Sequence, residues 1–122
     1  MPGTKLLTKL DAATGLRLAW RTAQDLGYSL TPLGEGANRF TATKGSMLGS
    51  FLAGALAPYC AFEISTGSYS DANEIILEKN SPGLLIGKMG LNKVNRQADE
   101  LIAAIVNAIE REGGTILERK DF

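Results

Sequence analysis

The sequence predicts an α+β fold in which an N-terminal and a C-terminal helix cover one face of a four-stranded antiparallel meander. Apolar residues recur every three to four positions near both ends of the chain, whereas they alternate with polar residues between about 28 and 78. Because helices lie at the ends rather than between successive strands, parallel crossovers are not expected. The length of 122 residues and the hydrophobic content of 44% fit a single globular domain spanning 1–122.

The first predicted element is a helix from about 11 to 26. Its apolar face is formed by Leu16, Ala19, Trp20, Ala23 and Leu26. Asp11 or Thr14 can accept the free amide protons at its start, and Gly27 can adopt the left-handed conformation that ends it. We expect Trp20 to anchor this helix on the core.

Four strands follow, separated by turn residues. The first two strands are predicted at 28–33 and around 40–43, with the turn at 34–36. In the third strand Cys60, Phe62 and Ile64 alternate with Ala61, Glu63 and Ser65. In the fourth strand Ile75 and Leu77 alternate with Glu74, Ile76 and Glu78. A connecting loop over 67–72 would pair Phe62 with Leu77 and Ile64 with Ile75 on the core face.

The second helix is predicted from about 92 to 112. Its apolar stripe consists of Leu91, Val94, Ala98, Leu101, Ile102, Ile105 and Ile109. Gly113 and Gly114 end it, and residues 115–119 form either a short fifth strand or an extended tail. We expect the core to join this stripe to the apolar side of the third and fourth strands.

Two predicted loops, 45–58 and 81–91, are apolar and rich in glycine, although loops are usually polar. In a meander both lie at the same end of the sheet. They either fold back over the core or form a surface for a second copy of the chain, giving a homodimer, or for another protein partner. The residues predicted to contact the partner are Met47, Leu48, Phe51, Leu52, Leu84 and Leu85.

Charge placement marks the same end of the sheet. The chain has 13 basic and 13 acidic residues, so its formal net charge is zero. Segments 36–62 and 79–98 nevertheless contain basic residues and no acidic residue. The predicted polyanion-binding residues are Lys44, Lys79, Lys88, Lys93 and Arg96. They form either a solvated basic face or a surface for RNA or an anionic membrane.

The segment Gly87-Lys88-Met89-Gly90, followed by a long helix, resembles the G-x-x-G segment of KH domains, particularly the bacterial type. The resemblance covers about 45 residues, from the fourth strand to the end. It implies single-stranded RNA binding, with Gly87, Lys88 and Gly90 clamping backbone nucleotides and Val94 as a buried anchor. The chain departs from the family pattern in the strands and the long apolar loop that precede this segment.

Catalysis, metals and cofactors are not expected. The chain has no His and one Cys, which removes the commonest general base and the usual zinc ligand sets. Cys60 falls on the apolar side of its strand, where we expect a core residue rather than a nucleophile. Glu63, Glu74 and Glu78 share the other face without further oxygen ligands. No signal peptide or membrane span is recognised, so the cytoplasm is the expected location.

Overall fold

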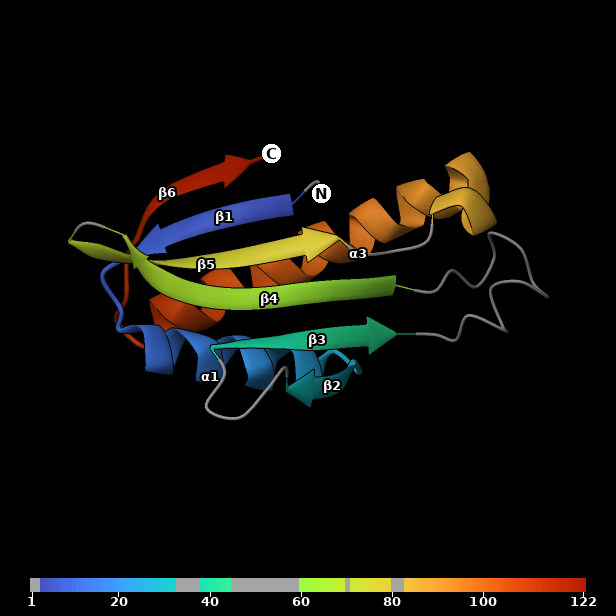
Figure 1. Ribbon diagram of the computed structural model, residues 1–122. Helices are drawn as coiled ribbons and strands as arrows, with labels where there is room; N and C mark the ends of the chain where they lie inside the picture. The colour runs from blue at the N-terminus through green and yellow to red at the C-terminus, as the bar shows by residue number, and fades with distance from the viewer. Residues whose placement is uncertain (1–2, 33–37, 45–59, 70, 80–82) are drawn as a thin grey trace.

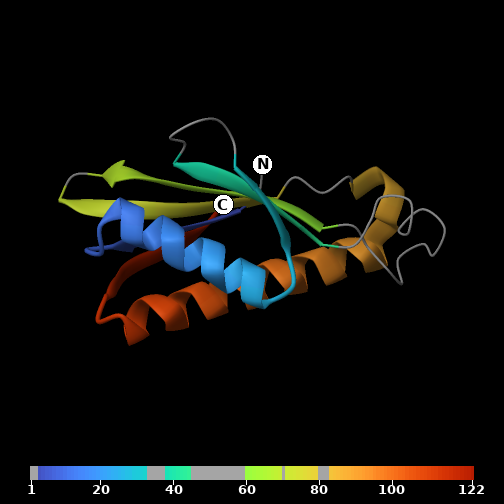
Figure 2. The same ribbon diagram turned by 90° about the horizontal axis from the view of Figure 1, so that it is seen from below.

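In the computed structural model, which describes residues 3–32, 38–44, 60–69, 71–79 and 83–122, two helices pack on one face of a six-stranded sheet (Figures 1 and 2). The elements in chain order are β1 (Gly3–Thr8), α1 (Ala12–Asp25), β2 (Ser29–Pro32), β3 (Arg39–Lys44), β4 (Cys60–Tyr69), β5 (Ala72–Lys79), α3 (Gly83–Arg111) and β6 (Ile116–Asp121). All neighbouring strands are antiparallel, in the order β2-β3-β4-β5-β1-β6. The α+β class is confirmed, but the four-stranded meander is wrong.

Strand β1 is the element that the sequence analysis missed. Thr4, Leu6 and Thr8 are buried and alternate with the half-buried Lys5 and Leu7, so the two-residue period was present in a short run. β1 pairs with β5 on one side and with β6 on the other. The first strand therefore lies inside the sheet, and α1 carries the chain across the sheet face to β2 at the far edge (Figure 1).

The C-terminal segment is a strand rather than an extended tail. β6 pairs with β1 from Thr4, which is opposite Asp121, to Leu7, which is opposite Glu118. A bulge at Leu7 and Thr8 then shifts the register by one residue. Beyond these pairs, Gly3 and Phe122 exchange two backbone hydrogen bonds of 2.9 Å. Because β1 was not expected, the strand with which β6 pairs was not predicted from the sequence.

The pairing of β4 with β5 differs from the prediction by two residues. Ile64 is opposite Leu77, and Phe62 is opposite Lys79 rather than Leu77. The strands continue to Tyr69 and Ala72, which pair, so the connection is tighter than the predicted 67–72 loop. A shift of two residues keeps each side chain on its predicted face, so the core face was correctly predicted while the register was wrong.

The core lies between this sheet face and the two helices. Its largest fully buried members from the strands are Leu6, Phe40, Phe62, Ile64, Ile75 and Leu77, and those from α3 are Val94, Leu101, Ile102, Ile105 and Ile109. Trp20 is half-buried and makes an edge-to-face contact with Phe40, with ring centroids 5.0 Å apart. The predicted apolar stripe of the second helix is confirmed from Val94 to Ile109, while the Leu91 side chain lies outside what the structure describes. The packing of Trp20 on the core is also confirmed.

Helix α1 begins and ends at the predicted signals. The Asp11 carboxylate accepts a hydrogen bond of 3.0 Å from the Thr14 amide, and Gly27 has a φ of 92° just after the helix. Hydrogen bonding from the Thr14 side chain, together with that from the Thr14 amide, holds the pKa of Asp11 below its ordinary value. Asp11, rather than Thr14, is therefore the capping residue.

Replacing Asp11 with Ala should lower the melting temperature at neutral pH. Since the pKa of Asp11 is lowered in the folded state, its stabilising effect is present above the ordinary pKa of 3.8 and disappears as the pH falls through the folded-state pKa. Thermal unfolding at pH 7 and in strong acid checks this. Asp25→Ala is the control, since a carboxylate in the last turn opposes the helix dipole. Equal effects of Asp11→Ala at both pH values would contradict the capping role.

Helix α3 starts earlier than predicted. It runs for 29 residues from Gly83 to Arg111, so residues 83–91 of the predicted loop are helical. At 1.5 Å per residue it is about 43 Å long, longer than the sheet face that it crosses. Figures 1 and 2 show that its first turns bend and extend past the ends of β4 and β5. Gly113, with a φ of 86°, follows its end, as the glycine pair predicted.

Candidate partner-binding surfaces

The two apolar segments leave the sheet at one end, as predicted. Lys44 at the end of β3 pairs with Cys60 at the start of β4, and Lys79 at the end of β5 pairs with Phe62. The early turns of α3 lie beyond the same end (Figure 1).

Of the predicted partner-binding residues, four lie outside the described residues: Met47, Leu48, Phe51 and Leu52. Leu84 and Leu85 belong to α3, but their side chains are outside what the structure describes. We name this region the apolar end; it comprises segments 45–59 and 80–91.

Two of the five predicted polyanion-binding residues are engaged within the fold. The Lys44 ammonium donates a hydrogen bond of 3.0 Å to the Leu26 carbonyl and lies 5.2 Å from the centroid of the Tyr28 ring. A cation there satisfies the carbonyl end of α1. The Lys79 ammonium donates a hydrogen bond of 3.1 Å to Asn95 Oδ1. Both lysines thus tie strand ends to helices.

The other three predicted basic residues belong to α3. Arg96 is exposed, while Lys88 and Lys93 have side chains that the structure does not describe. The Tyr28 hydroxyl donates to Gln97 Oε1 at 3.3 Å beside this part of the helix. Of the predicted polyanion-binding residues whose side chains the structure describes, Arg96 is therefore the exposed one.

The G-x-x-G segment does not form a loop. Gly87 and Gly90 lie inside α3, in its first turns. A nucleotide clamp of the KH kind needs these glycines in a loop. The predicted loop over 81–91 is therefore wrong from residue 83 onward. Val94 is buried as expected, with 1% of its surface exposed.

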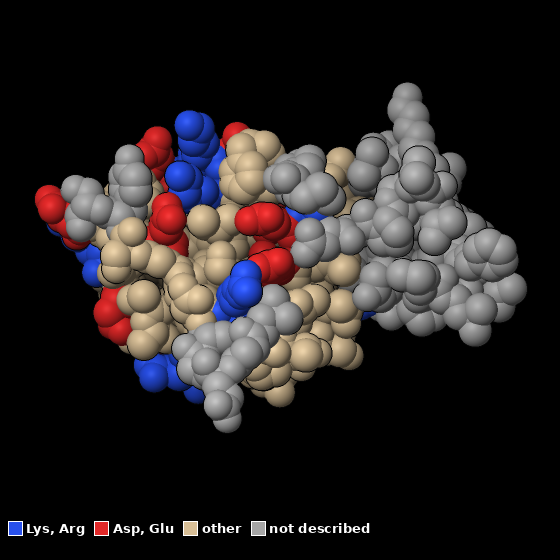
Figure 3. Space-filling model, viewed as in Figure 1, with Lys and Arg blue, Asp and Glu red and all other residues tan. Residues whose placement is uncertain are grey.

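The face of the sheet opposite the helices carries acidic and basic side chains side by side (Figure 3). Arg39 forms an ion pair with Glu63 at 3.4 Å, and Lys5 forms one with Glu74 at 3.7 Å. Glu63 lies directly opposite Glu78. The three glutamates share this face as predicted. Among the described residues, no group of three or more metal-ligating side chains is close enough to hold an ion.

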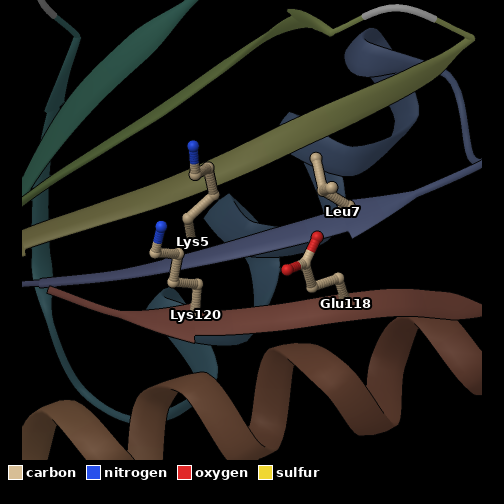
Figure 4. Close-up of a pocket in the computed structure, with 4 residues that line it drawn as sticks. All are labelled: Lys5, Leu7, Glu118 and Lys120. Carbon is tan, nitrogen blue, oxygen red and sulfur yellow. The ribbon is translucent and has the colours of Figure 1, made fainter.

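A small hollow of about 120 Å³ lies on the same face between β1 and β6. It is lined by Lys5, Leu7, Glu118 and Lys120, and Figure 4 shows both ammonium groups on the same side of the strands. Lys5 is directly opposite Lys120, and Leu7 is opposite Glu118. The sequence analysis missed this feature because it depends on the pairing of β1 with β6. The sequence feature that marks this hollow is the run of charged residues at 118–121. It indicates a charged strand surface only when the segment is known to pair with β1.

A second groove, of about 260 Å³, runs between the outer sides of α1 and α3. Its polar lining mixes Arg21, Asp25, Arg111 and Glu112, so the groove has no single sign of charge. No helix among the described residues has the length and apolar character needed to cross a membrane.

No family model matches this chain, and no curated protein matches it either.

Proposed function

We propose that the chain is a non-catalytic binding domain whose partner surface is the apolar end. The partner is a protein, either a second copy of this chain or another polypeptide. The single supporting observation is positional. An apolar, glycine-rich segment joins the end of β3 to the start of β4, and this is the end of the sheet at which the early turns of α3 run past the strands. Apolar residues at such a place fit a surface that a partner buries.

Phe40, Phe62 and Leu77 are each at most 1% exposed beneath α1 and α3. The described part of the sheet face thus packs against the two helices in one apolar core.

Binding of RNA or an anionic membrane is the competing proposal for the same end. Lys44 and Lys79 already have partners within the fold, which weakens it. Phosphate binding releases counterions, so its affinity falls steeply with salt, whereas apolar protein contacts respond little. Titration with single-stranded RNA and with anionic vesicles at two salt concentrations separates these cases. The proposed location is the cytoplasm, since a single cysteine forms no internal disulfide.

Replacing Leu52 with Glu should abolish association through the apolar end, because a buried charge without a partner is strongly unfavourable. Sedimentation at high micromolar concentration, and capture of a partner identified with the wild-type chain, measure the effect. Ala103→Glu is the matched control, since it adds the same charge at an exposed position of α3. Partner capture that is equal for the wild type and Leu52→Glu, together with self-association that is also unchanged, would reject the apolar end as the partner surface.

A further inference from the structure

The two edges of the sheet differ in how open they are to another strand. β2 has four residues and ends in Pro32, and a short edge strand with proline discourages pairing. β6 has six residues and no proline. The large hydrophobic residues exposed within the described part of the chain are Leu117, at 49%, and Phe122, at 53%, and both lie at the ends of β6. The β6 edge is therefore the one suited to accept a strand.

The hydrogen-bond pattern shows which backbone groups of β6 are free. Gly3 and Phe122 exchange both of their backbone hydrogen bonds. Since hydrogen-bonded and non-hydrogen-bonded pairs alternate in an antiparallel ladder, Lys120 and Glu118 also bond to β1. By the same alternation, the N–H and C=O groups of Arg119 and Asp121 point away from β1, toward the open edge of the sheet.

Two charged side chains on β6 lack a partner of opposite sign. Among the described residues, neither Glu118 nor Lys120 takes part in an ion pair. Lys120 faces Lys5 across the ladder, and like charges directly opposite each other are unfavourable. Figure 4 shows the Glu118 carboxylate beside Leu7, away from both ammonium groups. Glu118 and Lys120 are thus complementary groups that their own sheet does not bring together.

We infer that β6 pairs in an antiparallel manner with β6 of a second copy of this chain, about a two-fold axis at Arg119. This register joins the free backbone groups of the two Arg119 residues to each other across the axis. It places Glu118 opposite Lys120 twice, once on each side of the axis. The sheets of the two copies become one continuous sheet, in which β6 is no longer an edge strand.

The same register accommodates the remaining side chains. The two Arg119 side chains meet near the axis, but each already has two acidic neighbours, Asp99 at 3.7 Å and Asp121 at 3.4 Å. Hydrogen bonding from the Thr4 hydroxyl, together with nearby Arg119, keeps the pKa of Asp121 below its ordinary value, so this carboxylate stays charged.

Replacing Arg119 with Pro should convert the dimer to a monomer while β6 stays paired with β1. Proline removes the Arg119 N–H, which points outward, and leaves the bonds to β1 intact. Arg119→Ala is the matched control, since it loses the same ion pairs but keeps the N–H. Sedimentation should show a dimer for the wild type and for Arg119→Ala and a monomer for Arg119→Pro. A monomeric wild type at high micromolar concentration, or a dimeric Arg119→Pro, would overturn the inference.

A charge exchange tests the register without relying on proline. Glu118→Lys or Lys120→Glu alone places like charges opposite each other twice, and should raise the dissociation constant of the dimer about tenfold. The double variant Glu118→Lys with Lys120→Glu should restore it. Thermal unfolding of each variant at low concentration monitors the fold. Failure of the double variant to regain affinity, with its melting temperature unchanged, would contradict the register.

This inference is independent of the apolar end. Leu52→Glu should leave the β6 dimer intact, and Arg119→Pro should leave binding at the apolar end intact. Dimerisation that is lost in Leu52→Glu and kept in Arg119→Pro would overturn the β6 contact and favour self-association through the apolar end. Dimerisation that is kept in Leu52→Glu and lost in Arg119→Pro supports the β6 contact.

Discussion

Replacing Leu101 with Ala is expected to lower the free energy of unfolding by about 2–5 kcal/mol, because it removes buried methyl groups and leaves a cavity. Leu101 is fully buried on the face of α3 that packs on the sheet. Its neighbours in the stripe, Ile102 and Ile105, are also almost completely buried. The surroundings are closely packed and cannot collapse onto the missing side chain, which places the loss within this range.

Leu117→Ala is the matched control for this change, since it makes the same substitution on a side chain that is 49% exposed. Denaturant unfolding at a protein concentration low enough to keep the chain monomeric should show a much smaller loss for Leu117→Ala. A loss below about 1 kcal/mol for Leu101→Ala would mean that the apolar stripe of α3 does not face the core.

Replacing Phe40 with Ala is expected to cost about 3–5 kcal/mol. Phe40 is 1% exposed in β3, and its ring makes an edge-to-face contact with the Trp20 ring at an interplanar angle of 66°. The substitution removes both the buried area and the edge-to-face contact, which joins α1 to the sheet. Trp20 is the single tryptophan of the chain, so its fluorescence reports on this contact directly.

The control for Phe40 is Phe122→Ala, because Phe122 is 53% exposed. At low protein concentration we expect Phe122→Ala to change the free energy of unfolding far less than Phe40→Ala, with unaltered Trp20 fluorescence. Comparable losses from the two phenylalanines would place Phe40 at the surface and contradict the packing of α1 on β3.

The periodic and capping signals were sufficient for the helices and for the faces of the strands. Asp11 and Gly27 bounded α1 to within one residue, since a cap acts through the chain next to it. The side chains of Phe62 and Ile75 were placed on the correct face despite the wrong register, because any shift by two residues preserves the face. The glycines at 87 and 90 were misleading, since the helix extends through them.

For the candidate surfaces, the sequence placed the apolar segments and the basic residues at one end of the sheet. It did not reveal that Lys44 and Lys79 are held by Leu26 and Asn95, because those contacts join elements far apart in the chain. The β6 edge was missed for the same reason. The charges at 118–121 become a surface only after β1 pairs with both β5 and β6.

The sequence by itself determined the α+β class, the ends of α1, the C-terminal end of α3 and the residues that face the core, because these depend on interactions within a few residues of each other. Only the tertiary structure decided the strand order and the register. Both depend on pairing between segments as distant as Gly3 and Phe122, which local periodicity does not specify. The edge strand β6, with its unpaired Glu118 and Lys120, follows from that long-range pairing.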